Sequence, residues 1–213
     1  MKFRRIEAVF MKQIKDILKN KTALIQFVLF PLLAFILTET IAKSDKFLPD
    51  NYFVLLFAIM YVGMVPAINT ASIITEEKEK NTLRILMLAN VRPLEYLIGV
   101  GSYVFIVSSI GAVAFGFIGG YSGAQLGLFI IVLMVGILGS LILGSTIGIF
   151  AKNSMSSAGL VLPVSMITAF LPMIASFNET FESISRFLYT QQINYLIADL
   201  SIANFTFERF III

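Results

Sequence analysis

The side chains that could do chemistry gather in one charged stretch, residues 75–93, which includes Glu76, Glu77 and Glu79. Paired carboxylates can act as general acids and bases. The chain has no His and no Cys, so it lacks the commonest general base, and thiolate catalysis, disulfides and iron–sulfur clusters are excluded. It has no Gly-Lys dipeptide either, so it cannot form a phosphate-binding P-loop.

Membrane proteases are the enzymes to consider for so apolar a chain. The Glu76-Glu77 pair resembles the glutamate motif of CAAX-type membrane proteases, but those enzymes also use His. An aspartyl-type membrane protease needs two Asp within its spans, and the apolar segments of this chain contain none. We therefore predict a chain without catalytic residues, metal ligands or a cofactor of its own.

Five long apolar segments predict an all-α membrane protein. Hydrophobic residues make up 58% of the 213 residues and charged residues only 14%, with a mean hydropathy of +0.90. A soluble domain carries roughly 25% charged residues. A helix that crosses a bilayer needs about 20 apolar residues, and five segments meet this requirement: 23–42, 53–74, 96–118, 125–150 and 158–176. They show no alternation typical of a barrel, so helices are expected.

The basic residues predict the orientation of the chain. Twelve of the sixteen Lys and Arg precede the first apolar segment or lie between segments two and three or four and five. The positive-inside rule places these regions, and the N-terminus, in the cytoplasm. The net charge of +3 therefore reflects a basic cytoplasmic face, and no nucleic-acid partner is expected. Residues 209–213 begin another apolar run, either the start of a sixth span or a short tail; we expect the former.

Two segments outside the spans have the pattern of amphipathic helices. In residues 1–21, apolar residues recur at steps of three and four opposite a basic face, which favours a helix at the inner surface of the membrane. This helix could contact a cytoplasmic partner or serve only to set the topology. Residues 177–208 predict an extracellular insert of two short helices, which could cover an exit or pack under the headgroups.

The charged stretch 75–93 is predicted to continue the second span and then turn into a short helix. Glu76 and Lys80 are spaced to form an i,i+4 ion pair. Leu83 and Leu86 then fall on one face of a short helix, which ends before Pro93. Such a helix could lie on the membrane, fit a groove on a partner, or be a solvated connection.

Small and polar residues within the spans suggest how the helices pack. Residues spaced by four form small-xxx-small faces, which allow close helix approach and are interpreted as packing faces within the chain. They are Ser108, Ala112 and Gly116 in the third span and Gly136, Ser140, Gly144 and Gly148 in the fourth. Asn69, Thr70 and Ser72 could line a substrate path or form hydrogen bonds between helices. Glu39, the one charged residue in a span, is expected near the outer interface.

The stretch from Glu77 to Leu86, followed by Arg92-Pro93, resembles the signature of ABC-2-type transporter permeases. In that family an acidic-basic run precedes Gly-Thr-Leu-Glu, a Leu pair and a Pro-containing turn into the third helix. Here Asn81 stands in place of the usual Gly and Arg84 in place of a frequent Glu. The order of amphipathic helix, two spans, signature, three spans and outer insert is also similar, so the resemblance covers the whole chain as architecture.

The resemblance implies a division of labour between subunits. Two copies of this permease, or two related ones, would form the translocation path, and two separate cytoplasmic ATPase subunits would bind ATP and magnesium. Residues 75–93 would be the coupling segment that docks on the ATPase, and the N-terminal elbow helix would pack nearby. Seven residues would carry the coupling contact: Glu76, Glu77, Glu79, Asn81, Thr82, Leu83 and Leu86.

The sequence thus predicts the permease subunit of an ATP-driven exporter in a cell membrane, and specifically a bacterial cytoplasmic membrane. A secondary transporter or channel is the alternative, although it would need charges near the membrane midplane, and Glu39 is the only candidate. A membrane immunity or scaffold protein that transports nothing is a further alternative. The identity of the substrate does not follow from the sequence.

Overall fold

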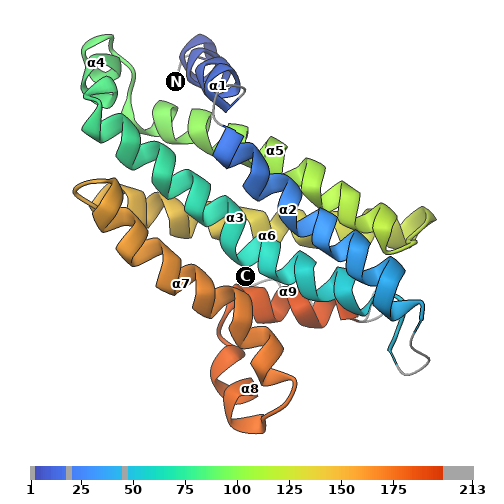
Figure 1. Cartoon of the computed structure of the whole chain (residues 1–213). Coiled ribbons are helices and arrows are strands. Elements are labelled where there is room, and N and C mark those ends of the chain that lie inside the picture. The colour runs from blue at the N-terminus through green and yellow to red at the C-terminus, as the bar shows by residue number, and fades with distance from the viewer. Residues whose placement is uncertain (1–2, 18–20, 45–47, 199–213) are drawn as a thin grey trace.

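The computed structural model describes residues 3–17, 21–44 and 48–198, and every regular element within them is a helix. The helices, shown in Figure 1, follow one another along the chain. They are α1 (Phe3–Ile17), α2 (Lys21–Leu37), the π-helical turn η1 (Thr38–Ala42), α3 (Tyr52–Glu79), α4 (Thr82–Leu88), α5 (Pro93–Ile118), α6 (Gly123–Phe150), α7 (Ser154–Ala175), α8 (Glu179–Ser185) and α9 (Tyr189–Ala198).

Five of these helices are long and apolar enough to cross a membrane, which confirms the predicted all-α class and the five apolar spans. They are α2 with η1, α3, α5, α6 and α7. Helix α3 is longer than the predicted span 53–74, because its charged end stays helical as far as Glu79. The predicted start of a sixth span, residues 209–213, lies outside the described residues.

Helix α3 is the centre of the bundle, and it contacts α2, α5, α6 and α7 (Figure 1). Its Tyr61 is fully buried and meets the rings of Phe30 and Phe115 edge-on. The Tyr61 hydroxyl donates a hydrogen bond to the carbonyl oxygen of Ser108 at 3.1 Å, beside Gly111, which leaves no room for a Cβ atom. The large aromatic side chain therefore joins α2, α3 and α5.

The small residues of α6 lie against α3. A Cβ atom on Gly136 would approach Val62 to 2.7 Å, and one on Gly148 would approach Ala71 and Ile74. Ser140 donates a hydrogen bond to the carbonyl oxygen of Val62. Gly144 lies against the backbone of Ala67, so the four positions form one continuous face along α3.

The small residues predicted on the third span lie on two sides of α5. Ser108 and Ala112 are fully buried, and the Ser108 carbonyl faces Tyr61 of α3. Gly116 faces α6 instead, where a Cβ atom would meet the side chain of Leu126 at 2.5 Å. Helix α5 therefore uses this stripe to pack against α3 and α6, two of the helices that it contacts.

Helices α1 and α4 lie at the same end of the bundle, which we term the α4 end (Figure 1). The amphipathic pattern of α1 buries Val9, Gln13 and Ile17. Val9 packs on α5 at Gly99, where an added Cβ atom would lie only 2.7 Å from the Val9 Cβ. This close approach fixes α1 against the start of α5.

Residues 177–198 contain the two predicted short helices, but α9 packs within the bundle instead of beyond it. The Tyr189 ring would meet a Cβ atom on Gly139 at 3.0 Å, and Ile193 one on Gly136 at the same distance, both near the middle of α6. Thr190 donates to the carbonyl oxygen of Thr168 in α7 at 2.6 Å. Helix α9 is thus a buried element of the core, in contact with α3, α6 and α7.

Candidate partner interface at the α4 end

The turn between α3 and α4 depends on Asn81, whose φ of 55° lies in the left-handed region. Gly and Asn adopt this conformation with the least strain. This explains why Asn81 can stand where the similar family signature has Gly. The Asn81 carbonyl accepts the first helical hydrogen bond of α4, from Ile85 N at 3.2 Å, so the turn leads directly into the short helix.

Helix α4 has an inner and an outer face, and the predicted leucines lie on the inner one. Leu83 and Leu86 pack against the cluster formed by Val9, Ile74, Tyr96 and Val100. Ile85 and Leu88 point outward, with 63% and 80% of their surface exposed. Among the predicted coupling residues, Leu83 and Leu86 therefore support α4, and the apolar surface that a partner could reach belongs to Ile85 and Leu88.

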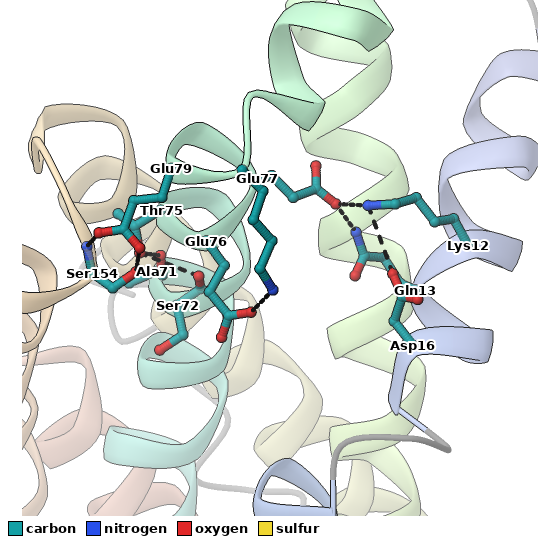
Figure 2. A network of polar contacts seen from close by, with 11 residues as sticks. Lys12, Gln13, Asp16, Ala71, Ser72, Thr75, Glu76, Glu77, Glu79 and Ser154 are labelled. Carbon is teal, nitrogen blue, oxygen red and sulfur yellow. Dashed lines mark hydrogen bonds and ion pairs between the residues drawn. The ribbon is translucent and has the colours of Figure 1, made fainter.

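Glu77 is buried against α1. Its Oε1 accepts a hydrogen bond from Gln13 Nε2 at 2.6 Å and forms an ion pair with Lys12 Nζ. Figure 2 shows Lys12 and Gln13 turned from α1 toward this carboxylate. With only 5% of its surface exposed, Glu77 joins α3 to α1 and has no free face for a partner.

Glu76 and Glu79 differ from Glu77 in their exposure. Glu76 forms the predicted i,i+4 pair with Lys80, at 3.1 Å on the surface. Glu79 accepts two hydrogen bonds from Ser154 at the first turn of α7: from the backbone N at 2.8 Å to Oε1, and from Oγ at 2.7 Å to Oε2. In Figure 2 this contact lies on a different side of α3 from Glu77.

Lys78, between these two glutamates, binds the end of α6. Its Nζ donates to the carbonyl oxygens of Gly148 at 2.8 Å, of Ala151 at 3.1 Å and of Ile149. The last carbonyls of a helix have no partner within the helix, and a cation near them is also favoured by the helix dipole. No local pattern in the sequence marks Lys78, because its partners lie about seventy positions further along the chain.

A second carboxylate, Glu95, also lies beneath α1. It is 1% exposed, its Oε2 lies 3.5 Å from Arg5 of α1, and the same oxygen accepts the backbone N–H of Arg92 at 3.1 Å. The second contact belongs to a capping box at the start of α5. The sequence contained a signal for this role, since Arg92-Pro93 followed by Glu95 is typical of a helix start.

The residues proposed to line a substrate path form hydrogen bonds inside the bundle. Asn69 donates to Gln26 of α2 at 3.0 Å and to the Val65 carbonyl at 2.9 Å. The Thr70 hydroxyl donates to its own helix at Pro66. Ser72 is half-buried, and its carbonyl accepts from Thr75. Of these contacts, the one from Asn69 to Gln26 joins two helices, and those of Thr70 and Ser72 stay within α3.

Glu39, the one charged residue in the predicted spans, lies in η1 at the opposite end of the bundle from α4. It is exposed and pairs with Lys43 one turn later, at 2.5 Å. Glu39 therefore lies near the end of its apolar helix, and a position at the outer interface stays a prediction. Across residues 3–17, 21–44 and 48–198, no group of three Asp or Glu residues could hold a metal ion.

Comparison with known proteins connects this architecture to a family. No curated protein and no solved structure matches the chain. One protein family, described as ABC-2 family transporter protein, matches residues 9–211, which include the five apolar helices, the α3–α4 turn, α8 and α9. The match agrees with the resemblance of residues 77–93. The chain therefore belongs to the ABC-2 family of transporters and is a multi-pass membrane component of the permease type.

Proposed function

We propose that this chain is the permease subunit of an ATP-driven exporter and that the α4 end is its cytoplasmic face. Two soluble ATPase subunits, which bind ATP and magnesium, would dock there, and a second identical or related permease would complete the translocation path. The twelve Lys and Arg assigned to the basic side support this orientation. The membrane would be the bacterial cytoplasmic membrane, and this chain would hydrolyse nothing itself.

The observation that carries the proposal is the outer face of α4. Ile85 and Leu88 are exposed on a seven-residue helix that is far too short to cross a bilayer. Arg84 lies exposed beside them. The inner face is held by Leu83 and Leu86, so the helix presents its outer residues from a fixed support. An apolar face with such a support is suited to a groove on a partner protein.

The test is co-purification of this chain with a soluble ABC-type ATPase from the same cell. Ile85→Asp and Leu88→Asp should each weaken the complex at least about thirtyfold, since a central apolar contact contributes about 2 kcal/mol or more. Phe177→Asp is the matched control. Phe177 is 76% exposed, but it follows the last turn of α7, whereas the first turn of α7 lies at the α4 end. A chain that purifies alone, or a complex unaffected by both α4 variants, would contradict the proposed docking site.

The direction of transport needs a separate measurement. The complex should hydrolyse ATP in proteoliposomes, and candidate substrates should accumulate on the side away from the ATPase. Because the substrate is unknown, peptides, lipids, polysaccharides, drugs and ions would each be supplied as a class. Accumulation on the ATPase side would show an importer and contradict export.

A further inference from the structure

We propose that Glu77, Lys78 and Glu79 form a three-way clamp, through which a displacement of α4 is passed to α1, α6 and α7 together. The inference rests on the proposed docking of an ATPase at α4. It assigns these three residues a positioning role, since none of them belongs to the exposed apolar face of α4. The clamp joins four helices at the α4 end.

Helix geometry explains how three consecutive residues reach three helices. Successive side chains of an α-helix are rotated by about 100° around the axis, so residues 77, 78 and 79 leave α3 in different directions. Glu77 is directed to α1, Lys78 to the last turn of α6 and Glu79 to the first turn of α7. The clamp therefore surrounds much of α3 at a single level.

The Lys78 ammonium group has as many donor hydrogens as it has carbonyl partners at the end of α6. An ammonium group has three donor hydrogens, and three carbonyl oxygens at the end of α6 accept from it, those of Gly148, Ile149 and Ala151. One turn before Lys78 in α3, Ile74 also faces α6, because a Cβ atom on Gly148 would lie 3.0 Å from the Ile74 Cβ. The two helices are therefore in close contact at this level. The Lys78 hydrogen bonds thus strengthen an interface between α3 and α6 in which close packing already limits relative movement of the two helices.

The contact of Glu79 is matched to the start of the next helix. Its carboxylate accepts both the backbone N–H and the hydroxyl of Ser154, where the first N–H groups of α7 have no helical partner. Only residues 151–153 separate α6 from α7. The short connection is therefore held on one side by a cation and on the other by a carboxylate, both supplied by α3.

The ion pair between Glu76 and Lys80 lies at the same level of α3 but does not belong to the clamp. Glu76 and Lys80 pair with each other on the surface of α3 and reach no other helix. Exposed pairs of this kind contribute little to stability. Loss of the Glu76 charge is therefore the matched control for loss of the clamp residues, since it changes the same turn of α3 without separating any helices.

The first experiment measures the clamp without an ATPase. The chain has no Cys, so Arg84→Cys and Lys152→Cys introduce a single pair of spin labels, on α4 and on the α6–α7 connection. Pulsed electron resonance in nanodiscs should give one narrow distance distribution. Lys78→Met and Glu79→Ala should each raise the fraction of molecules with other label-to-label distances roughly tenfold. This is the factor expected for loss of a charge-assisted hydrogen bond.

Matched variants keep this measurement informative. Lys78→Arg retains donors for the α6 carbonyls and should restore the narrow distribution, and Ser154→Ala, which removes one of two hydrogen bonds to Glu79, should have a smaller effect than Glu79→Ala. Glu76→Gln should leave the distribution unchanged. Equal broadening by Glu76→Gln, or a narrow distribution in Lys78→Met and Glu79→Ala, would overturn the clamp.

The second experiment separates the clamp from the proposed function. In the complex with the ATPase, labels at Thr40 in η1 and at Lys152 before α7 report movement of the first turn of α7 relative to η1, which the clamp does not hold. ATP with vanadate provides the trapped state. The ATP-dependent change in distance should fall at least about threefold in the double variant Lys78→Met/Glu79→Ala, where α7 has lost charge-assisted hydrogen bonds to α3. The ATPase should remain bound, because Ile85 and Leu88 are intact. An unaltered change overturns the clamp alone, whereas failure of the wild-type chain to bind the ATPase overturns the proposed function and the clamp with it.

Discussion

Gly144 and Ala67 bring α6 and α3 into backbone contact: a Cβ atom on Gly144 would lie 2.8 Å from the Ala67 Cα. No rotation of a side chain can relieve this approach, since the atoms of Ala67 concerned belong to its backbone. Lipid offers no hydrophobic drive for helix association, so such close packing contributes a large share of the stability of a membrane bundle.

Gly144→Ala should therefore destabilise the bundle by about 1–3 kcal/mol, the usual cost of overpacking. The measurement is the thermal unfolding midpoint in detergent. Gly127→Ala is the matched control in the same helix, because a Cβ atom there meets nothing within 4 Å. The control should be neutral or stabilising by up to about 1 kcal/mol, since Ala is the better helix former. Equal effects of the two variants would show that α6 does not pack on α3 at Gly144.

Substitutions of Asn81 should separate backbone strain from loss of the side chain. Asn81→Gly should preserve both stability and ATPase binding, because Gly adopts the left-handed conformation freely. Asn81→Val should cost about 1–2 kcal/mol, since a side chain branched at Cβ is strained at this φ, whereas the short polar side chain of Asn tolerates it. The orientation of α4 can be followed by spin labels at Arg84 and Lys152. A tolerated valine would mean that the turn does not require the φ of 55°.

Removal of the Glu77 carboxylate should loosen α1. Glu77→Ala deletes the acceptor shared by Lys12 and Gln13, and Gln13 is itself buried. Hydrogen bonds to charged groups contribute about 1.5–3 kcal/mol each, so backbone amides of α1 should exchange with solvent at least about tenfold faster. Glu76→Ala should leave this exchange unchanged. Identical protection of α1 in the two variants would contradict the anchoring role of Glu77.

The hydroxyl of Tyr189 should fix α9 within the bundle. It lies 2.7 Å from Ser140 Oγ, and Ser140 in turn donates to the Val62 carbonyl of α3. Tyr189→Phe should cost about 0.5–1.5 kcal/mol, the net contribution of one hydrogen bond, and should speed amide exchange within α9. Tyr195→Phe is the control on the same helix, because the Tyr195 hydroxyl binds Glu182 at the surface. A larger effect at Tyr195 would place the anchor of α9 elsewhere.

The sequence predicts local structure well where the signal is local. Long apolar runs identify all five spanning helices, and the spacing of Glu76 and Lys80 predicts the pair that extends α3 past residue 74. The short helix after Asn81 follows from the same reasoning. Each of these features depends on residues within a few turns of one another.

The contacts that build the interface could not be predicted in the same way. Glu77 and Glu79 have equivalent positions in a charged run, yet one is buried against α1 and the other binds α7. Their partners lie 64 and 75 positions away, and no local pattern reports such pairing. For α4, the spacing of Leu83 and Leu86 identifies an apolar face but does not show which face the bundle covers.

The long separation between the clamp residues and their partners has a consequence for synthesis of the protein. Lys78 and Glu79 leave the ribosome about seventy residues before the carbonyl and hydroxyl groups that bind them. Throughout that interval water must solvate both charges, which holds the trailing end of α3 out of the hydrocarbon. The same side chains therefore first anchor a nascent helix at the membrane surface. Lys78 can bind only after the end of α6 has been made, and Glu79 only after the first turn of α7 has followed.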